Sequence, residues 1–420
     1  MRRYRLFTIF IIVFMDMLGF GLILPLLPYY AESYGAAPAV VGLLVASYAA
    51  AQLVGAPFLG RLSDRYGRRP ILLFSEAGSV AGFLLMGFAD PLGRMFASLA
   101  APQAENLFVI GVLFFSRVVD GLTGGNITVA QAYIADITDE QNRAKSLGLI
   151  GAAFGLGFII GPAAGGTLSR WGYNFPAFVA AAVFFANWLS IFFFLPESLA
   201  GEQKEKALRR QRAPFTLQAL LHALNRPKVG PLLHIRLFYG LAFATFQTIF
   251  SLYAQGIGLN AQTTGYVLAY VGVLSVVVQG GLIGMLTRRF RDNWLITAGL
   301  WLMAFSLLVW GFTTKLWLLL IILLPLSLAG GVLNTILQSA ISKSVPPEEM
   351  GGILGISASL EAISRVVAPS IGGYLIQNLG LWSPGVFSAA LMFWVVGFTY
   401  RHIVLPARRE RLMLEGQGAP

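Results

Sequence analysis

Apolar stretches of about twenty residues recur from one end of this 420-residue chain to the other, and they restrict its fold more than any other feature. A helix of roughly 20 residues crosses the hydrocarbon core of a bilayer. Hydrophobic residues make up 56% of the chain and charged residues 12%, which is more apolar surface than a soluble core can bury. The stretches do not alternate polar with apolar residues as barrel strands do. The sequence therefore predicts an all-α membrane protein.

Twelve of these stretches are long enough to be transmembrane helices. Their approximate bounds are 6–30, 39–61, 70–90, 107–134, 145–169, 175–195, 232–255, 263–287, 294–313, 316–342, 352–377 and 384–404. Basic residues lie mainly in the loops on one side, and the opposite loops hold little more than Arg94, Arg170 and Lys315. By the positive-inside rule, the basic side and both termini are expected in the cytoplasm. The net charge of +11 reflects this orientation, so nucleic acid is not an expected partner.

The chain has no cysteine, which excludes disulfides, thiolate nucleophiles and cysteine metal sites. We expect no metal ion and no other cofactor. Arginine greatly outnumbers lysine, as in proteins from GC-rich bacterial genomes, and the first apolar stretch is too long for a cleaved signal. We therefore expect a multi-pass, monomeric protein of the bacterial inner membrane, in contact with the lipid bilayer.

The two halves of the chain repeat each other at an offset of about 207 residues. The matching positions are Gly124 and Gly331, Gln131 and Gln338, Pro162 and Pro369, and Gly165-Gly166 and Gly372-Gly373. Six predicted helices separate the copies, so the repeats are parallel, and a substrate path is expected between the two bundles near the midplane. The predicted domains are an N-terminal six-helix bundle (1–196), a charged cytoplasmic linker (197–229), a C-terminal six-helix bundle (230–405) and a cytoplasmic tail (406–420).

The loop after the second stretch reads GRLSDRYGRRP over residues 60–70. Glycine permits close helix packing and a tight turn, proline can begin the next helix, and an acid among arginines can form an ion pair. An ordinary positive-inside loop would need neither the acid nor the glycines. The candidate residues of this cytoplasmic gate are Gly60, Asp64, Arg65, Gly67, Arg68 and Arg69, with Asp136 and Arg143 as candidate partners.

This loop resembles the signature loop of the major facilitator superfamily, and other motifs resemble its tetracycline exporter branch. Arg117 begins RVVDG in the fourth stretch, which is similar to the arginine motif of the family. Residues 151–166 read GAAFGLGFIIGPAAGG and resemble the antiporter motif of drug:proton exchangers. Asp16 in FMDMLGFGLILPLLP and the run Pro196-Glu197-Ser198 are similar to the tetracycline exporters. The resemblance implies the two-bundle fold, a drug-like small-molecule substrate and coupling to protons.

The antiporter-like stretch places several glycines on one helix face. The candidate hinge residues are Gly157, Gly161, Pro162, Gly165 and Gly166. Glycines at i, i+4 and i+8 let the backbone of a neighbouring helix approach closely, and a proline removes a backbone hydrogen bond and permits a kink. Plain helix packing is the alternative to a hinge.

Charged side chains inside the predicted spans are the remaining candidates, because each costs roughly 2.5–3.5 kcal/mol on insertion scales unless it is paired or hydrated. Asp16 and Arg117 lie near the midplane, and we expect them to pair, with Asp120 one turn beyond Arg117. A carboxylate that exchanges a proton for an arginine partner can couple proton movement to a conformational change. A static ion pair is the alternative. Glu76 lies only about two turns into its span and could simply reach the headgroups.

Glu361 and Arg365 lie one helical turn apart, a spacing that favours an ion pair. Two interpretations stay open, a structural pair or a second site for coupling or substrate. Aromatic and amide residues of the second half could line an amphiphilic substrate pocket, although such residues also face lipid or neighbouring helices. They are Phe243, Phe246, Gln247, Phe250, Tyr266, Tyr270, Asn334 and Gln338.

The sequence thus predicts a proton-coupled antiporter that exports hydrophobic or amphiphilic small molecules by alternating access. A transporter of a lipid, sugar or other metabolite is the rival with the same fold. A membrane enzyme is disfavoured because the histidines His222, His234 and His402 all lie near the cytoplasmic boundary. A structural scaffold would not need charged residues at the midplane.

Overall fold

The computed structural model describes residues 2–199 and 217–406, and these residues are helical with no strand among them. The chain divides into two compact units, Met1–Arg212 with Phe250–Val273, and Ala213–Ile249 with Leu274–Pro420. The first unit therefore also contains a segment from beyond the linker. The proposed domain boundaries stay predictions, and parts of the linker and of the tail lie outside the described residues.

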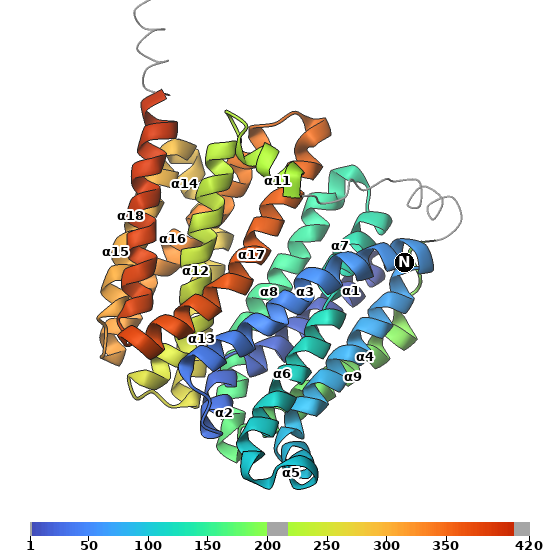
Figure 1. Cartoon of the computed structure of the whole chain (residues 1–420). Coiled ribbons are helices and arrows are strands. Elements are labelled where there is room, and N and C mark those ends of the chain that lie inside the picture. Colours follow the sequence, from blue (N-terminus) through green and yellow to red (C-terminus); the bar gives the residue numbers. More distant parts are fainter. Residues whose placement is uncertain (1, 200–216, 407–420) are drawn as a thin grey trace, which may run out of the picture. The chain divides into compact units, whose positions relative to one another are not determined.

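Among the described residues, nine α-helices of the chain's first half belong to the first unit (Figure 1). They are α1 (Arg2–Ile23), α2 (Leu27–Ser33), α3 (Pro38–Tyr66), α4 (Arg68–Gly87), α5 (Ala89–Ala100), α6 (Glu105–Thr123), α7 (Asn126–Ile137), α8 (Glu140–Leu168) and α9 (Phe175–Phe194). The short helices η1 (Pro102–Ala104) and η2 (Ser169–Trp171) lie between them. The helix α1 packs mainly against α8 and α9, and α4 packs against α6 and α9.

The chain continues through the helices of its second half. They are α11 (Leu217–Leu224), α12 (Gly230–Gly256), α13 (Ala261–Val277), η3 (Val278–Leu282), α14 (Ile283–Arg289), α15 (Asp292–Gly311), α16 (Leu316–Lys343), α17 (Pro347–Leu379), α18 (Ser383–Thr399) and η4 (Tyr400–Val404). Within the second unit, α15 packs against α16 and α18.

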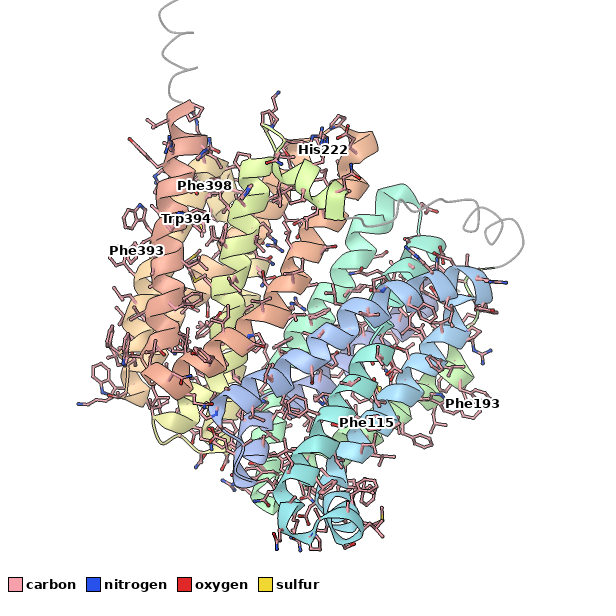
Figure 2. All side chains as sticks on the ribbon, viewed as in Figure 1. Phe115, Phe193, His222, Phe393, Trp394 and Phe398 are labelled. Carbon is pink, nitrogen blue, oxygen red and sulfur yellow. The ribbon has the colours of Figure 1, made fainter. Side chains whose placement is uncertain are left out.

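The described residues contain twelve helical segments that are long and apolar enough to cross a membrane, which confirms the predicted number of spans. Large apolar side chains also remain exposed along the helices of both units, among them Phe115, Phe193 and Trp394. Figure 2 shows Phe393, Trp394 and Phe398 along α18. Such exposure is expected for side chains that contact lipid. The helix α5, between the third and fourth spans, was not predicted.

The fourth span is broken at Gly124 and Gly125, between α6 and α7, where the sequence predicted one continuous helix. Side chains of neighbouring helices bond to the freed backbone groups. Gln52 Nε2 donates to the Gly124 carbonyl oxygen at 3.0 Å, and Ser75 Oγ accepts from the Gly125 amide at 3.3 Å. Non-helical backbone at membrane depth is tolerated only with such partners. The break places Asn126 at the start of α7, facing the interior of the first unit.

The glycine face of α8 lies directly against α1. A Cβ atom at Gly161 would lie 2.7 Å from the Cα atom of Gly21, and the positions of Gly157 and Gly165 are equally closed by Met17 and Leu22. Only glycine allows the two backbones to approach this closely. Pro162 lies within the same helix, and Gly166 faces the start of α13. The close packing is thus present, and the hinge role stays a prediction.

Candidate functional site

Four polar side chains meet in the interior of the first unit, and we call them the acid–amide cluster. Asp16 comes from α1, Glu76 from α4, Asn126 from α7 and Asn187 from α9. All four are buried, with Asp16 exposed to only 3% and Glu76 to 0%. Glu76 does not reach the headgroups, a possibility that the sequence leaves open, because α4 turns this side chain towards α7 and α9.

The two asparagines supply the hydrogen-bond donors of the acid–amide cluster. Asn187 Nδ2 lies 3.0 Å from Asp16 Oδ1, 3.1 Å from Glu76 Oε1 and 3.1 Å from the Ile12 carbonyl oxygen. Asn126 Nδ2 donates to Glu76 Oε1 at 2.9 Å. The two carboxyl groups thus share one amide donor, Asn187 Nδ2. The amides therefore hold both acids in one buried network.

The acid–amide cluster has more acceptors than donors. Asp16 Oδ2, Glu76 Oε2, Asn126 Oδ1 and Asn187 Oδ1 are buried and have no hydrogen-bond donor among the described residues. An ionised carboxylate only accepts hydrogen bonds, whereas a protonated carboxyl group also donates one. An acceptor-rich site of this kind is suited to bind protons.

Arg117 and Asp120 form a separate buried ion pair on α6. Arg117 Nη1 lies 3.3 Å from Asp120 Oδ2, and the guanidinium carbon lies 4.8 Å from the centre of the Phe83 ring. The predicted pair between Asp16 and Arg117 is wrong, because Asp120 is one turn away on the same helix while Asp16 is held by Asn187 of α9. Asp16 and Asp120 nevertheless border one small cavity of about 30 Å³. The cavity is large enough to hold water.

The ion-pair network expected at the gate is formed by residues of α3, α4 and α7 next to the turn at Gly67. Arg68 pairs with Asp64 at 2.6 Å and with Asp136 of α7 at 3.0 Å. Gly67, with φ of +109°, adopts a conformation that favours glycine. Within the described part of the chain, Arg65 has no ion pair with this network; it is exposed, and its guanidinium lies over the ring of Tyr66.

Glu197 is a member of this network that the sequence did not predict. Its carboxylate accepts hydrogen bonds from the backbone amides of Arg68 at 2.9 Å and Arg69 at 3.1 Å. It therefore binds the first amides of α4, which have no partner within the helix.

Two further gate candidates remain. Gly60 is buried within α3. The side chain of Arg143 lies outside the described residues.

A second charged group lies in the second unit, and we call it the arginine–glutamate cluster. Arg365 Nη2 lies 2.6 Å from Glu361 Oε1, so the expected pair on α17 is present. Arg236 of α12 contacts the other oxygen of Glu361 at 2.6 Å and donates to Asn334 Oδ1 of α16 at 2.7 Å. Arg236 was missed, although a single arginine within the predicted span 232–255 is a visible signal.

The predicted substrate residues differ in their exposure. Phe246 and Phe250 are buried, and Phe246 packs edge to face on Trp310 with ring centres 5.1 Å apart, so these two side chains are part of the packed interior. Phe243 stacks on Tyr239, and Asn334 is bound to Arg236. Gln247, Tyr266, Tyr270 and Gln338 are at least partly exposed, as are Phe243 and Asn334, and the contact of all these residues with substrate stays a prediction.

No group of three or more histidine, cysteine, aspartate or glutamate side chains within the described ranges is arranged to hold a metal ion. The described clusters contain carboxylates, amides and guanidinium groups. Carboxylates can bind protons, and amides and guanidinium groups can form hydrogen bonds with polar or charged groups of a small molecule.

A family model described as Major Facilitator Superfamily matches residues 9–293 and 280–417. The chain is 32% identical over 407 residues to the class G tetracycline resistance protein of Vibrio anguillarum, covering 95% of this chain and 96% of that protein. It is 27% identical over 406 residues to multidrug resistance protein 2 of Bacillus subtilis, covering 93% and 94%. A crystal structure of the nucleoside transporter NupG is similar with a TM-score of 0.74 and 12% identity, covering 95% of this chain and 99% of that chain.

Proposed function

Since this chain is a member of the major facilitator superfamily, and so a transporter and not an enzyme, we propose that it exports hydrophobic or amphiphilic small molecules in exchange for protons. Relatives named for tetracycline and multidrug resistance, similar over nearly the whole chain, support a drug-like substrate. The orientation with both termini in the cytoplasm, in a bacterial cell membrane, follows from the basic loops and is part of the proposal.

The observation that carries the proton coupling is the acid–amide cluster. Asp16 and Glu76 lie together, fully buried, with amide donors and no cation bonded to them among the described residues. Two negative charges side by side in a medium of low polarity are strongly unfavourable. At least one proton therefore stays on the pair while the site is closed.

Proton release requires a change in the surroundings of this pair. In a cycle of alternating access, hydration of the cavity that borders Asp16 and Asp120 would stabilise the ionised carboxylates and let a proton leave. Closure would favour proton uptake again. Asp16 is the proposed proton carrier, Glu76 shares its proton, and Arg117 offsets the charge of Asp120. Exchange follows if substrate and proton compete for this site: a proton bound from outside displaces the substrate there, and the protonated, substrate-free protein then closes and releases the proton to the cytoplasm.

Two further elements fit this cycle. The network of Asp64, Arg68, Asp136 and Glu197 ties α3, α4 and α7 together at the end of the first unit that is expected to face the cytoplasm. The glycine face of α8 permits close packing on α1, the helix that carries Asp16. We propose that the network acts as part of the cytoplasmic gate and that α8 acts as the hinge.

Transport of a lipid, sugar or other metabolite remains the alternative within this family. The first test is the thermal stability of the purified protein with a panel of compounds: tetracycline, aromatic dyes, phospholipids and sugars. We expect stabilisation by tetracycline or an aromatic dye, and pH-driven uptake of the same compound into proteoliposomes. Stabilisation by a sugar alone would contradict the proposal. Uptake that is the same with and without an imposed pH gradient would contradict it as well.

A further inference from the structure

The arginine–glutamate cluster, formed by Arg236, Asn334, Glu361 and Arg365, has a charge that its own members do not balance. One carboxylate lies between two guanidinium groups, each 2.6 Å away. Arginine stays protonated in proteins, so neither positive charge can be removed by loss of a proton. The cluster therefore has a net charge of +1 as long as Glu361 is ionised.

The two arginines differ in what they still can bind. Arg236 is 7% exposed and is held by Glu361 and Asn334, so its position is fixed by the interior of the unit. Arg365 is 58% exposed, and only its Nη2 atom hydrogen-bonds within the described part of the chain. A guanidinium group has five N–H donors in one plane. Arg365 therefore keeps a free edge that can bind two oxygens of one acid group.

The depth of Arg365 in the membrane indicates what its free edge can bind. The residue lies midway along the candidate span Glu349–Leu379, far from both of its ends. Contact of a charged side chain with lipid at this depth is unfavourable in free energy. Such a side chain therefore almost always faces a protein interior or a water-filled path. An exposed guanidinium in the middle of the span is thus available to a solute in such a path.

We propose that the arginine–glutamate cluster is the binding site for the anionic group of an aromatic amphiphile, with Arg365 in direct contact with a carboxylate or sulfonate of the substrate. The inference rests on the proposed transport function and specifies its substrate class. A cationic substrate would meet a net positive charge here. The aromatic body has a candidate neighbour on α12, because Phe243 lies two turns from Arg236 on the same helix and is only partly buried. Tyr239, on which Phe243 stacks, is itself buried.

Two dyes with the same aromatic skeleton provide the test. 1-Anilinonaphthalene-8-sulfonate is anionic, and N-phenyl-1-naphthylamine lacks only the sulfonate. Equilibrium dialysis of both dyes against the full-length protein in detergent, corrected for binding to empty micelles, gives the two Kd values. We expect the sulfonate to bind about tenfold or more tightly than the neutral dye, as for a hydrogen bond to a charged group.

Two variants alter the cluster in opposite directions. Arg365→Gln should weaken binding of the sulfonate about tenfold and leave the neutral dye unchanged, because it removes the free guanidinium. Glu361→Gln should tighten binding of the sulfonate, because it raises the net charge of the cluster. A purely structural role predicts that both variants weaken binding or that neither does. Arg401→Gln, which removes an exposed arginine outside the cluster, is the matched control and should bind both dyes like the unmodified protein.

Equal Kd values for the two dyes, or unchanged sulfonate binding by Arg365→Gln, would overturn the inference. Weaker sulfonate binding by Glu361→Gln in a protein that stays folded would overturn it as well. The measurement needs no pH gradient, so it is independent of proton coupling. A protein that binds the sulfonate as expected but shows no pH-driven transport would contradict the proposed function alone.

Discussion

Glu76 and Asn187 are 111 positions apart in the sequence, and the amide nitrogen of Asn187 lies 3.1 Å from Glu76 Oε1. The contact links α4 to α9, and the same amide reaches Asp16 of α1 at 3.0 Å. One neutral side chain thus holds two acids together. An arginine or lysine in its place would neutralise the acids and fix them as carboxylates. An amide bonds to a carboxyl group in either protonation state, and this property allows a proton to come and go.

Replacing Glu76 tests whether the second acid takes part in transport. Glu76→Gln keeps an acceptor for the amides but cannot carry a proton, so we expect normal folding and pH-driven transport reduced at least severalfold. Glu76→Leu leaves the amide donor of Asn126 without its acceptor, which should lower stability by about 1–3 kcal/mol, whereas Asn187 keeps Asp16 and the Ile12 carbonyl oxygen as acceptors. Thermal unfolding and vesicle transport of both variants distinguish these effects. Full transport by Glu76→Gln would show that Asp16 works alone.

The contact between α1 and α8 predicts a strong effect of one added methyl group. Gly161→Ala would place its Cβ atom 2.7 Å from the Cα atom of Gly21, and relieving this overlap should cost about 1–3 kcal/mol. Gly151→Ala on the same helix meets no atom within 4 Å and is the matched control. Both variants are compared by thermal unfolding in detergent. Equal stability of the two would mean that the helices do not pack through this face.

Glu197 should contribute to stability through the start of α4. Glu197→Ala removes the acceptor of the Arg68 and Arg69 backbone amides, and we expect a loss of about 1 kcal/mol, as for other helix N-terminal caps. Glu197→Gln retains an acceptor oxygen and should lose less. Glu105→Ala removes a more exposed acid of the same unit and serves as the control. A Glu197→Ala protein as stable as this control would remove Glu197 from the network.

The arginine–glutamate cluster also predicts a stability pattern. Glu361→Gln leaves two arginines facing each other, and because Glu361 is itself about a third exposed, we expect a loss of only about 1–2 kcal/mol. Adding Arg236→Met should restore much of this stability, since it removes the buried charge that has lost its partner. Melting temperatures of the single and double variants decide the question. A double variant less stable than the single one would argue against repulsion as the cause.

Local sequence patterns predicted the number of spans and one ion pair of this molecule. The twelve spans follow from apolar length, and the Glu361–Arg365 pair follows from its i, i+4 spacing. The contacts of Arg236 with Glu361 and of Asn187 with Glu76 depend on how distant helices are rotated against each other. The glycine-rich hydrophobic spans are apolar on most of their surface, so their sequence gives little indication of which face points inward. The wrong pairing of Asp16 with Arg117 has this origin.

The most direct test of the account is proton-driven transport by Asp16→Asn, with Asp90→Asn as a control for loss of a carboxylate elsewhere in the same unit. Purified proteins are placed in proteoliposomes with an imposed pH gradient, and accumulation of tetracycline, or of the compound that stabilises the protein most, is measured. The unmodified protein and Asp90→Asn should accumulate the compound against its gradient until an uncoupler is added. Asp16→Asn should exchange the compound at equal pH on both sides but show no pH-driven accumulation. Undiminished accumulation by Asp16→Asn would contradict the assignment of Asp16 as the proton carrier.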